Sequence, residues 1–190
     1  YLLGMAHYKI GQYAGAIDRL KEVKEWKDSI SESAYLHLGH SYLRIGDEEK
    51  AKLSYAAAIQ LNINSKVREE AMYNYVQITY LQGSATGESI TAFKQFLTEY
   101  PNTKYANKVY ALMADMYLTS KNYQAAYEAL SEIPTPDTKM QETQQYLRYQ
   151  LGMDAFFQGK MQDASHWMTQ VIEQAKQSSE HKTEAYYVRA

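Results

Sequence analysis

Apolar and small residues recur along this chain in two alternating helical patterns, with polar positions between them. Small residues recur at spacings of 35, 37, 38 and 38, at Gly4, Gly39, Val76, Ala114 and Gly152. An alanine follows each of them, at Ala16, Ala51, Ala92, Ala126 and Ala164. Bulky apolar residues near both sets keep to one side of a helix. The pattern predicts an internal repeat whose unit is a pair of antiparallel helices.

The same periodicity predicts the extent of each helix, and no segment carries the alternating pattern of a strand. We expect helices over 2–10, 13–25, 31–45, 47–61, 66–82, 87–99, 103–119, 122–132, 139–158 and 161–178, with a further one opening near 182. Gly11, Gly46 and Gly159 stand where the first helix of a pair must stop, because glycine adopts the left-handed conformation at little cost. Asp47 is a good N-cap for the next helix. The fold class is therefore all-α.

Two further sets of positions are predicted to fill the space beside the small residues. One set contains Leu20, Tyr55, Phe96, Leu130 and Met168. The other contains Leu3, Leu38, Tyr75, Met113 and Leu151. Each lies at a spacing that places it on the buried face of its helix. We expect a larger residue at a small-residue position to push the paired helices apart.

The second unit carries the most specific motif. Residues 34–42 read Ala-Tyr-Leu-His-Leu-Gly-His-Ser-Tyr, and Gly46, Ala51, Tyr55 and Ala58 follow. This resembles the tetratricopeptide repeat, in which an aromatic, Leu-Gly and Tyr precede Ala, an aromatic and Ala over two helices. The resemblance implies a right-handed α-solenoid, a single array over 1–190 with about five hairpins at 1–28, 31–63, 66–101, 103–136 and 139–178 and the start of another helix at 182–190. Since both ends fall inside such units, we expect a fragment of a longer protein.

The third unit departs from this frame. Its small residue and its alanine are 16 residues apart, whereas the distance is 12 in the other units. The added residues fall around 83–87, and they either lengthen a helix by about one turn of roughly 3.6 residues or enlarge the connection. Glu99 also stands where the repeat has a small residue late in its second helix.

Composition narrows the function classes. The chain has 20 basic and 22 acidic residues spread evenly, which argues against nucleic acid as a partner. No run approaches the roughly 18 apolar residues of a membrane span, so we expect no direct membrane insertion by this chain. It has no cysteine, which excludes disulfides, thiolate nucleophiles and thiolate metal sites.

In repeats of this kind the first helix of each pair lines a concave groove, where partners bind. The resemblance places the partner-binding groove at His37, His40, Arg44, Tyr73, Asn74, Gln77, Lys108, Asp115, Tyr149 and Gln150, with Ser33, Leu36, Glu70, Ala111, Tyr146 and Met153 beside them. Tyrosines in such a groove offer a rigid apolar face and a hydroxyl for binding a peptide. The alternative is that these residues are only the solvated side of the helices. The carboxylate clamp of chaperone-binding members is missing, because only Asn74 matches it.

Catalytic and metal-binding chemistry finds little support. His37 and His40 are three residues apart on one helix, but neither a carboxylate on the same face nor a cysteine completes a metal site. Residues 83–89 contain two glycines without the Gly-Lys-Ser/Thr of a phosphate loop. We therefore expect no enzyme activity, no cofactor and no metal.

The resulting hypothesis is a non-catalytic scaffold that binds a protein or peptide in the groove. Two alternatives stay open: a structural subunit of a bacterial envelope complex, and an accessory domain of an enzyme or sensor. Phe93 to Phe96 and the Tyr-Pro-Asn-Thr-Lys-Tyr-Ala of 100–106 resemble repeats of bacterial cell-envelope proteins. That resemblance favours the periplasm or envelope, with the cytoplasm as the alternative; the oligomeric state is open.

Overall fold

The structure, a computed structural model, describes residues 1–23, 26–82, 87–174 and 180–189, and within them it contains eleven α-helices and no strand. The prediction of an all-α fold built from helix pairs is confirmed. Helices in the first part of the chain are α1 (Leu2–Lys9), α2 (Tyr13–Lys21), α3 (Ser29–Arg44), α4 (Glu48–Leu61), α5 (Ser65–Leu81) and α6 (Gly87–Glu99). Those in the second part are α7 (Ala106–Thr119), α8 (Tyr123–Ser131), α9 (Thr138–Phe157), α10 (Met161–Gln174) and α11 (Glu180–Arg189).

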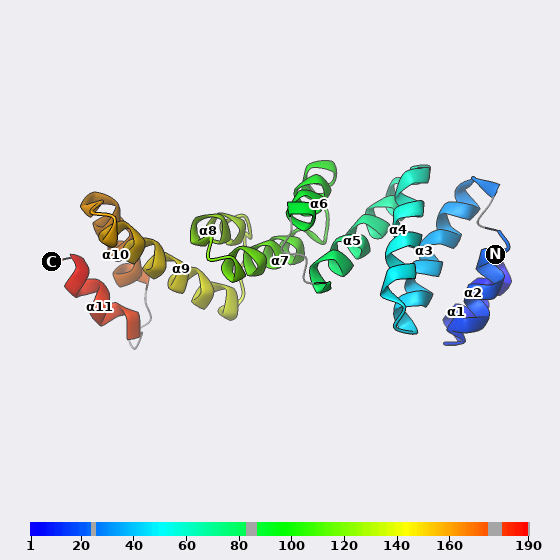
Figure 1. The fold of residues 1–190 in the computed structure, drawn as a ribbon, viewed down its shortest axis with the longest axis horizontal. Coiled ribbons are helices and arrows are strands. Elements are labelled where there is room, and N and C mark those ends of the chain that lie inside the picture. Colours follow the sequence, from blue (N-terminus) through cyan, green and yellow to red (C-terminus); the bar gives the residue numbers. More distant parts are fainter. Residues whose placement is uncertain (24–25, 83–86, 175–179, 190) are drawn as a thin grey trace. The chain divides into compact units, whose positions relative to one another are not determined.

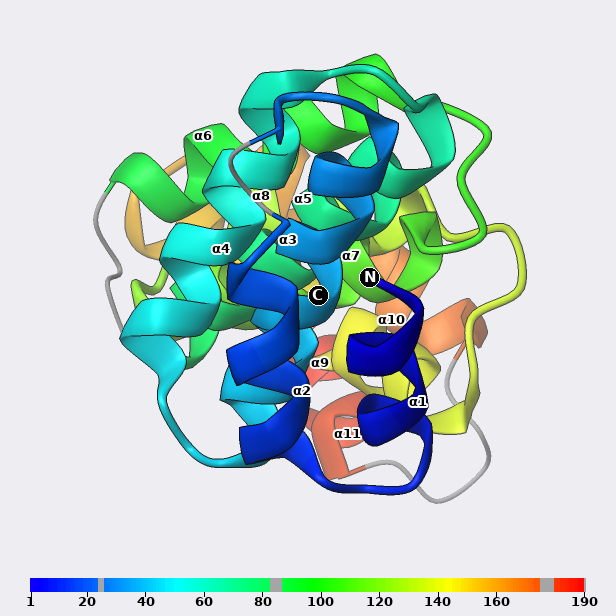
Figure 2. The same cartoon turned by 90° about the vertical axis from the view of Figure 1, so that its right-hand side faces the viewer.

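These helices form two compact units, Tyr1–Thr103 and Lys104–Ala190. In the first unit each helix packs on the next, and α3 also packs on α1 and α5 (Figure 1). Figure 2 shows α1 and α2 side by side, joined by a short turn. In the second unit α7 pairs with α8 and α9 with α10, and α11 packs on both α9 and α10. A single array over 1–190 and its superhelical hand stay predictions.

The connections within the helix pairs follow the predicted turn chemistry. Gly11, Gly46 and Gly159 have φ angles of 78°, 81° and 72°, in the left-handed region where glycine carries no steric cost. The carboxylate of Asp47 accepts a hydrogen bond from the backbone N–H of Lys50 at 3.1 Å, so it caps α4 as expected. In the fourth pair Lys121 takes the left-handed position, with φ of 58°.

The small residues of the first helices leave room for the bulky residues of the second helices. A Cβ added at Gly39 would lie 2.4 Å from Cε1 of Tyr55, and one at Gly152 would lie 2.7 Å from Cε of Met168. Tyr55 and Met168 are fully buried, so the predicted packing of these residues is confirmed. Leu3 is an exception: it is 55% exposed, because α1 packs on α2 and α3 through its other faces.

Gly39→Ala is expected to destabilise the fold by up to about 2 kcal/mol. Overpacking against the buried ring of Tyr55 costs about 1–3 kcal/mol, and the better helix propensity of alanine returns about 1 kcal/mol. Gly15→Ala is the control, because the added Cβ would meet the half-buried side chain of His7, at 3.0 Å, and no fully buried ring. Urea unfolding measures both changes. Equal effects at the two glycines would contradict the packing argument.

The third pair accommodates its unusual residues by polar contacts. Glu99 pairs with the guanidinium of Arg68 on α5, which also donates to the Tyr100 hydroxyl at 3.1 Å and to the carbonyl of Ile59 at 3.3 Å. This pair lowers the pKa of Glu99. A carboxylate is therefore tolerated where the repeat has a small residue, because it holds the end of α6 against the start of α5.

The four added residues of the third repeat fall largely on 83–86, which lie outside the described residues. The flanking helix is nevertheless informative. Leu81 ends α5 as far beyond Val76 as Arg44 ends α3 beyond Gly39. The insertion therefore does not lengthen the first helix of this pair.

A buried carboxylate joins the second and third pairs. Glu32 of α3 is fully buried, and its two oxygens accept hydrogen bonds from the backbone N–H groups of Ile63 and Asn64 at 2.9 and 2.8 Å. These N–H groups belong to the connection between α4 and α5, and buried backbone donors need such a partner. No periodic signal in the sequence marks Glu32, because its partners are backbone atoms.

Candidate functional site

The candidate site of the first unit is one face of α3 and α5. His37, His40 and Arg44 follow one another on α3 at spacings of three and four, which places them on one side of the helix. Asn74 and Gln77 do the same on α5. The two histidines, Asn74 and Gln77 are half-buried, and Arg44 is exposed. Since α3 packs on α5, the structure brings these predicted residues onto one continuous surface, which we call the α3–α5 face.

Aromatic rings border this face on the side of α1. The ring of Tyr8 lies 5.6 Å from that of His37 and 6.1 Å from that of His40, measured between centroids. Tyr1 lies 6.4 Å from His37. Tyr55 reaches from α4 across Gly39 to within 5.5 Å of the His40 ring. The two imidazoles are therefore held in place by packing, as a preformed part of the surface.

Hydrogen bonds fix the proton positions of both histidines. Nδ1 of His37 lies 2.7 Å from the carbonyl oxygen of Ser33, which is an acceptor, so this Nδ1 carries a proton. Nε2 of His40 lies 3.4 Å from the amide nitrogen of Asn74, which is a donor, so this Nε2 is an acceptor.

Burial keeps His40 neutral. It lowers the pKa of His40 to about 4, and the nearby charges of His37 and Arg44 act in the same direction. The His40 side chain is only 17% exposed, whereas that of Glu70, whose carboxylate lies 3.6 Å from Nε2 of His40, is 45% exposed. At neutral pH the charge of Glu70 is therefore not balanced by His40.

Tyr73 and Leu36 do not belong to the exposed part of this face. Tyr73 is 7% exposed and Leu36 is 4% exposed. The Tyr73 ring packs 6.3 Å from that of Phe96, and its hydroxyl accepts a hydrogen bond from the amide nitrogen of Gln77 at 2.9 Å. Their positions on the helix turn these side chains toward α6 and the core, so they support the face from below and do not offer a contact surface.

The remaining predicted groove residues lie in the second unit. Lys108 and Asp115 are exposed on α7, and Gln150 is half-buried on α9. Tyr149 stacks on His181 of α11 at 4.4 Å, and its hydroxyl donates to Glu184, which raises the pKa of Tyr149 to about 12. Tyr149 therefore fastens α9 to α11.

A cavity of about 310 Å³ lies between α7 and α9 in the second unit. Its apolar floor includes Ala111, Ala114, Leu118, Leu130 and Met140. Its polar rim is formed by Asp115, Asp137, Lys139 and Thr143. The predicted groove residues Ala111 and Asp115 thus contribute to a real hollow.

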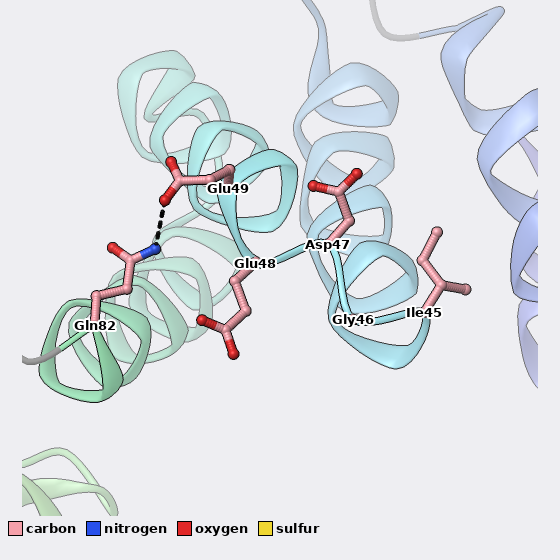
Figure 3. Close-up of a pocket in the computed structure, with 6 residues that line it drawn as sticks. All are labelled: Ile45, Gly46, Asp47, Glu48, Glu49 and Gln82. Carbon is pink, nitrogen blue, oxygen red and sulfur yellow. Dashed lines mark hydrogen bonds between the residues drawn. The ribbon is translucent and has the colours of Figure 1, made fainter.

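A larger and more open hollow of about 900 Å³ lies at the turn between α3 and α4 (Figure 3). Asp47, Glu48 and Glu49 line it together with Gln82, whose amide nitrogen donates to Glu49 at 2.8 Å. The acidic residues stand at the N-terminus of α4, where they satisfy or favour its free N–H groups. Helix capping accounts for this cluster.

The described residues were also compared with the requirements of a metal site and of a membrane-spanning helix. Among them, no group of three or more His, Asp or Glu side chains is placed to hold a metal ion. The two histidines of α3 are engaged with the Ser33 carbonyl and Asn74, as described above. In the same part of the chain, none of the helices combines the length and the apolar character needed to cross a membrane.

Comparisons with known proteins agree with the repeat pattern. Residues 32–62 match a family model described as a tetratricopeptide repeat, and residues 1–29 match a second model with the same description. The crystal structure of a tetratricopeptide repeat protein from Parabacteroides merdae ATCC 43184 is similar, with a TM-score of 0.65 and 15% identity over 97% of this chain and 70% of that one. At this identity the likeness concerns the fold alone. None of the curated proteins matches the chain in sequence.

Proposed function

Because the chain belongs to the tetratricopeptide repeat family, whose repeats mediate protein–protein interaction and whose members are typically non-catalytic scaffolds, we propose that it binds a protein or peptide partner on the α3–α5 face. The observation that carries this proposal is the fixed orientation of the polar side chains there. His37, His40 and Asn74 are each held by a hydrogen bond within the chain. A partner that binds such a surface loses little free energy in ordering it.

The proposal is tested by selecting random displayed peptides on the whole chain and mapping the selected binders by NMR. We expect selected peptides to shift the signals of α3 and α5, and Asn74→Ala or His37→Ala to weaken binding about tenfold, the effect of losing about 1.4 kcal/mol. Lys94→Ala is the matched control, since Lys94 is exposed on α6, the second helix of its pair. Binders that leave α3 and α5 unshifted would overturn the proposal.

A further inference from the structure

On the α3–α5 face, the amide nitrogens of Asn74 and Gln77 and Nδ1 of His37 make hydrogen bonds within the chain. The amide nitrogen of Asn74 donates to the carbonyl of Glu70 at 2.7 Å and faces Nε2 of His40 at 3.4 Å. Asn74 therefore keeps its carbonyl oxygen for a partner. Gln77 behaves alike, because its amide nitrogen donates to the Tyr73 hydroxyl and its oxygen remains.

Two further groups on the face are also acceptors. His37 donates through Nδ1 to Ser33, and in the neutral form of this ring Nε2 offers a lone pair. Glu70 offers a carboxylate whose side chain is 45% exposed. Because burial lowers the pKa of its neighbour His40 to about 4, that imidazole carries no charge at neutral pH and leaves the negative charge of Glu70 uncompensated.

The ring of Tyr8 adds an aromatic surface next to these acceptors, and a cation is attracted to the face of such a ring. The exposed Arg44 is the cation of α3 closest to this site, one turn beyond His40. Its charge opposes a cationic partner, and its exposure allows solvent to screen that repulsion.

We propose that the α3–α5 face selects a basic peptide segment, with an arginine or lysine side chain donating to Glu70, Asn74 and Gln77. This inference rests on the proposed function and specifies its partner. A surface with several hydrogen-bond acceptors and one unbalanced carboxylate binds hydrogen-bond donors, and a guanidinium supplies several N–H donors in one plane. A partner carboxylate placed between Glu70, Asn74 and Gln77 would meet their oxygens, and this part of the face therefore disfavours it.

The test uses three acetylated, amidated peptides that differ only in a central Arg, Gln or Glu in an alanine background, titrated into the whole ¹⁵N-labelled chain. We expect the Arg peptide to shift the side-chain amide signal of Asn74 and the signals of α3 and α5, and the Glu peptide to leave them unchanged. Glu70→Gln should weaken the Arg peptide about tenfold, as expected for a charge-assisted hydrogen bond. Arg44→Gln should tighten it about twofold, because it removes an exposed like charge.

Glu48→Gln is the matched control, because it makes the same change of charge on α4 and should leave the affinity unchanged. Binding of the Glu peptide as tight as that of the Arg peptide, or a Glu70→Gln variant of unaltered affinity, would overturn the inference. If acidic peptides from the random selection lose affinity on Asn74→Ala, the inference of a basic partner is refuted and the proposed function still holds. If the selected peptides leave the NMR signals of α3 and α5 unshifted, the proposed function itself is refuted.

Discussion

Glu32→Ala is expected to lower the free energy of unfolding of the first unit by about 3 kcal/mol. The substitution removes the carboxylate that accepts hydrogen bonds from the backbone N–H groups of Ile63 and Asn64. Each buried donor left without an acceptor costs about 1–3 kcal/mol. The substitution also leaves a gap in a fully buried position. Because the two N–H groups begin the connection into α5, the loss should loosen α5 against α3. Urea unfolding followed by circular dichroism measures the change.

Two further variants separate this account from a general intolerance of substitution. Glu32→Gln keeps the shape and one acceptor oxygen, but it points an NH₂ group at the second backbone donor, so we expect a smaller loss of about 2 kcal/mol. Glu48→Gln makes the same change of charge on an exposed side chain in the first turn of α4 and should lower stability by less than about 1 kcal/mol. A Glu32→Gln variant as stable as the parent protein would show that the two hydrogen bonds contribute nothing.

The second large effect is a loss of stability in mild acid caused by His40. Its pKa is about 4 in the folded chain and 6.5 in an unfolded one, so the unfolded state binds the proton first as the pH falls. The stabilisation is therefore complete above pH 6.5 and is lost as the pH falls from 6.5 toward 4. With about 1.36 kcal/mol for each pKa unit, the loss reaches about 3 kcal/mol.

The measurement is the urea midpoint of the parent protein and of His40→Gln between neutral pH and pH 4.5, with His166→Gln as a control because His166 is exposed on α10. We expect the parent protein and His166→Gln to lose stability in parallel and His40→Gln to lose much less. An NMR titration of the His40 ring should place its midpoint far below that of an exposed histidine. Parallel curves for all three proteins would refute the assignment to His40.

The repeat architecture could be predicted because its signals are local. A small residue at a fixed place in each helix of a pair, a glycine at the end of the first helix and an aspartate before the second each act within a few residues. Gly46, Asp47 and the buried Tyr55 accordingly behave as predicted. Lys121 shows the limit of this logic, because a residue without the glycine signal adopts the left-handed conformation that its turn requires.

The candidate site could be predicted only in part. Helical spacing places His37 and His40 on one side of α3, because residues three or four apart share a side of a helix. The packing of α3 on α5 then brings Asn74 beside His40. It does not distinguish Tyr73 from its exposed neighbours, since a rotation of part of a turn decides whether a side chain faces the partner or the core. Tyr73 is buried against Phe96, and that contact spans two helices.

The sequence by itself determined the class of fold, the helix pairs, their turns and the small-to-large packing inside each pair, since all of these depend on spacings within one unit. Only the tertiary structure decided the contacts between residues that lie far apart in the sequence. The Glu32 carboxylate and the Arg68–Glu99 pair each join residues about thirty positions apart. The amide nitrogen of Asn74 donates to the carbonyl of Glu70, and this contact determines the direction in which the amide points. The periodicity of the sequence carries no information on such contacts, because each contact occurs once and depends on how neighbouring helices pack against one another.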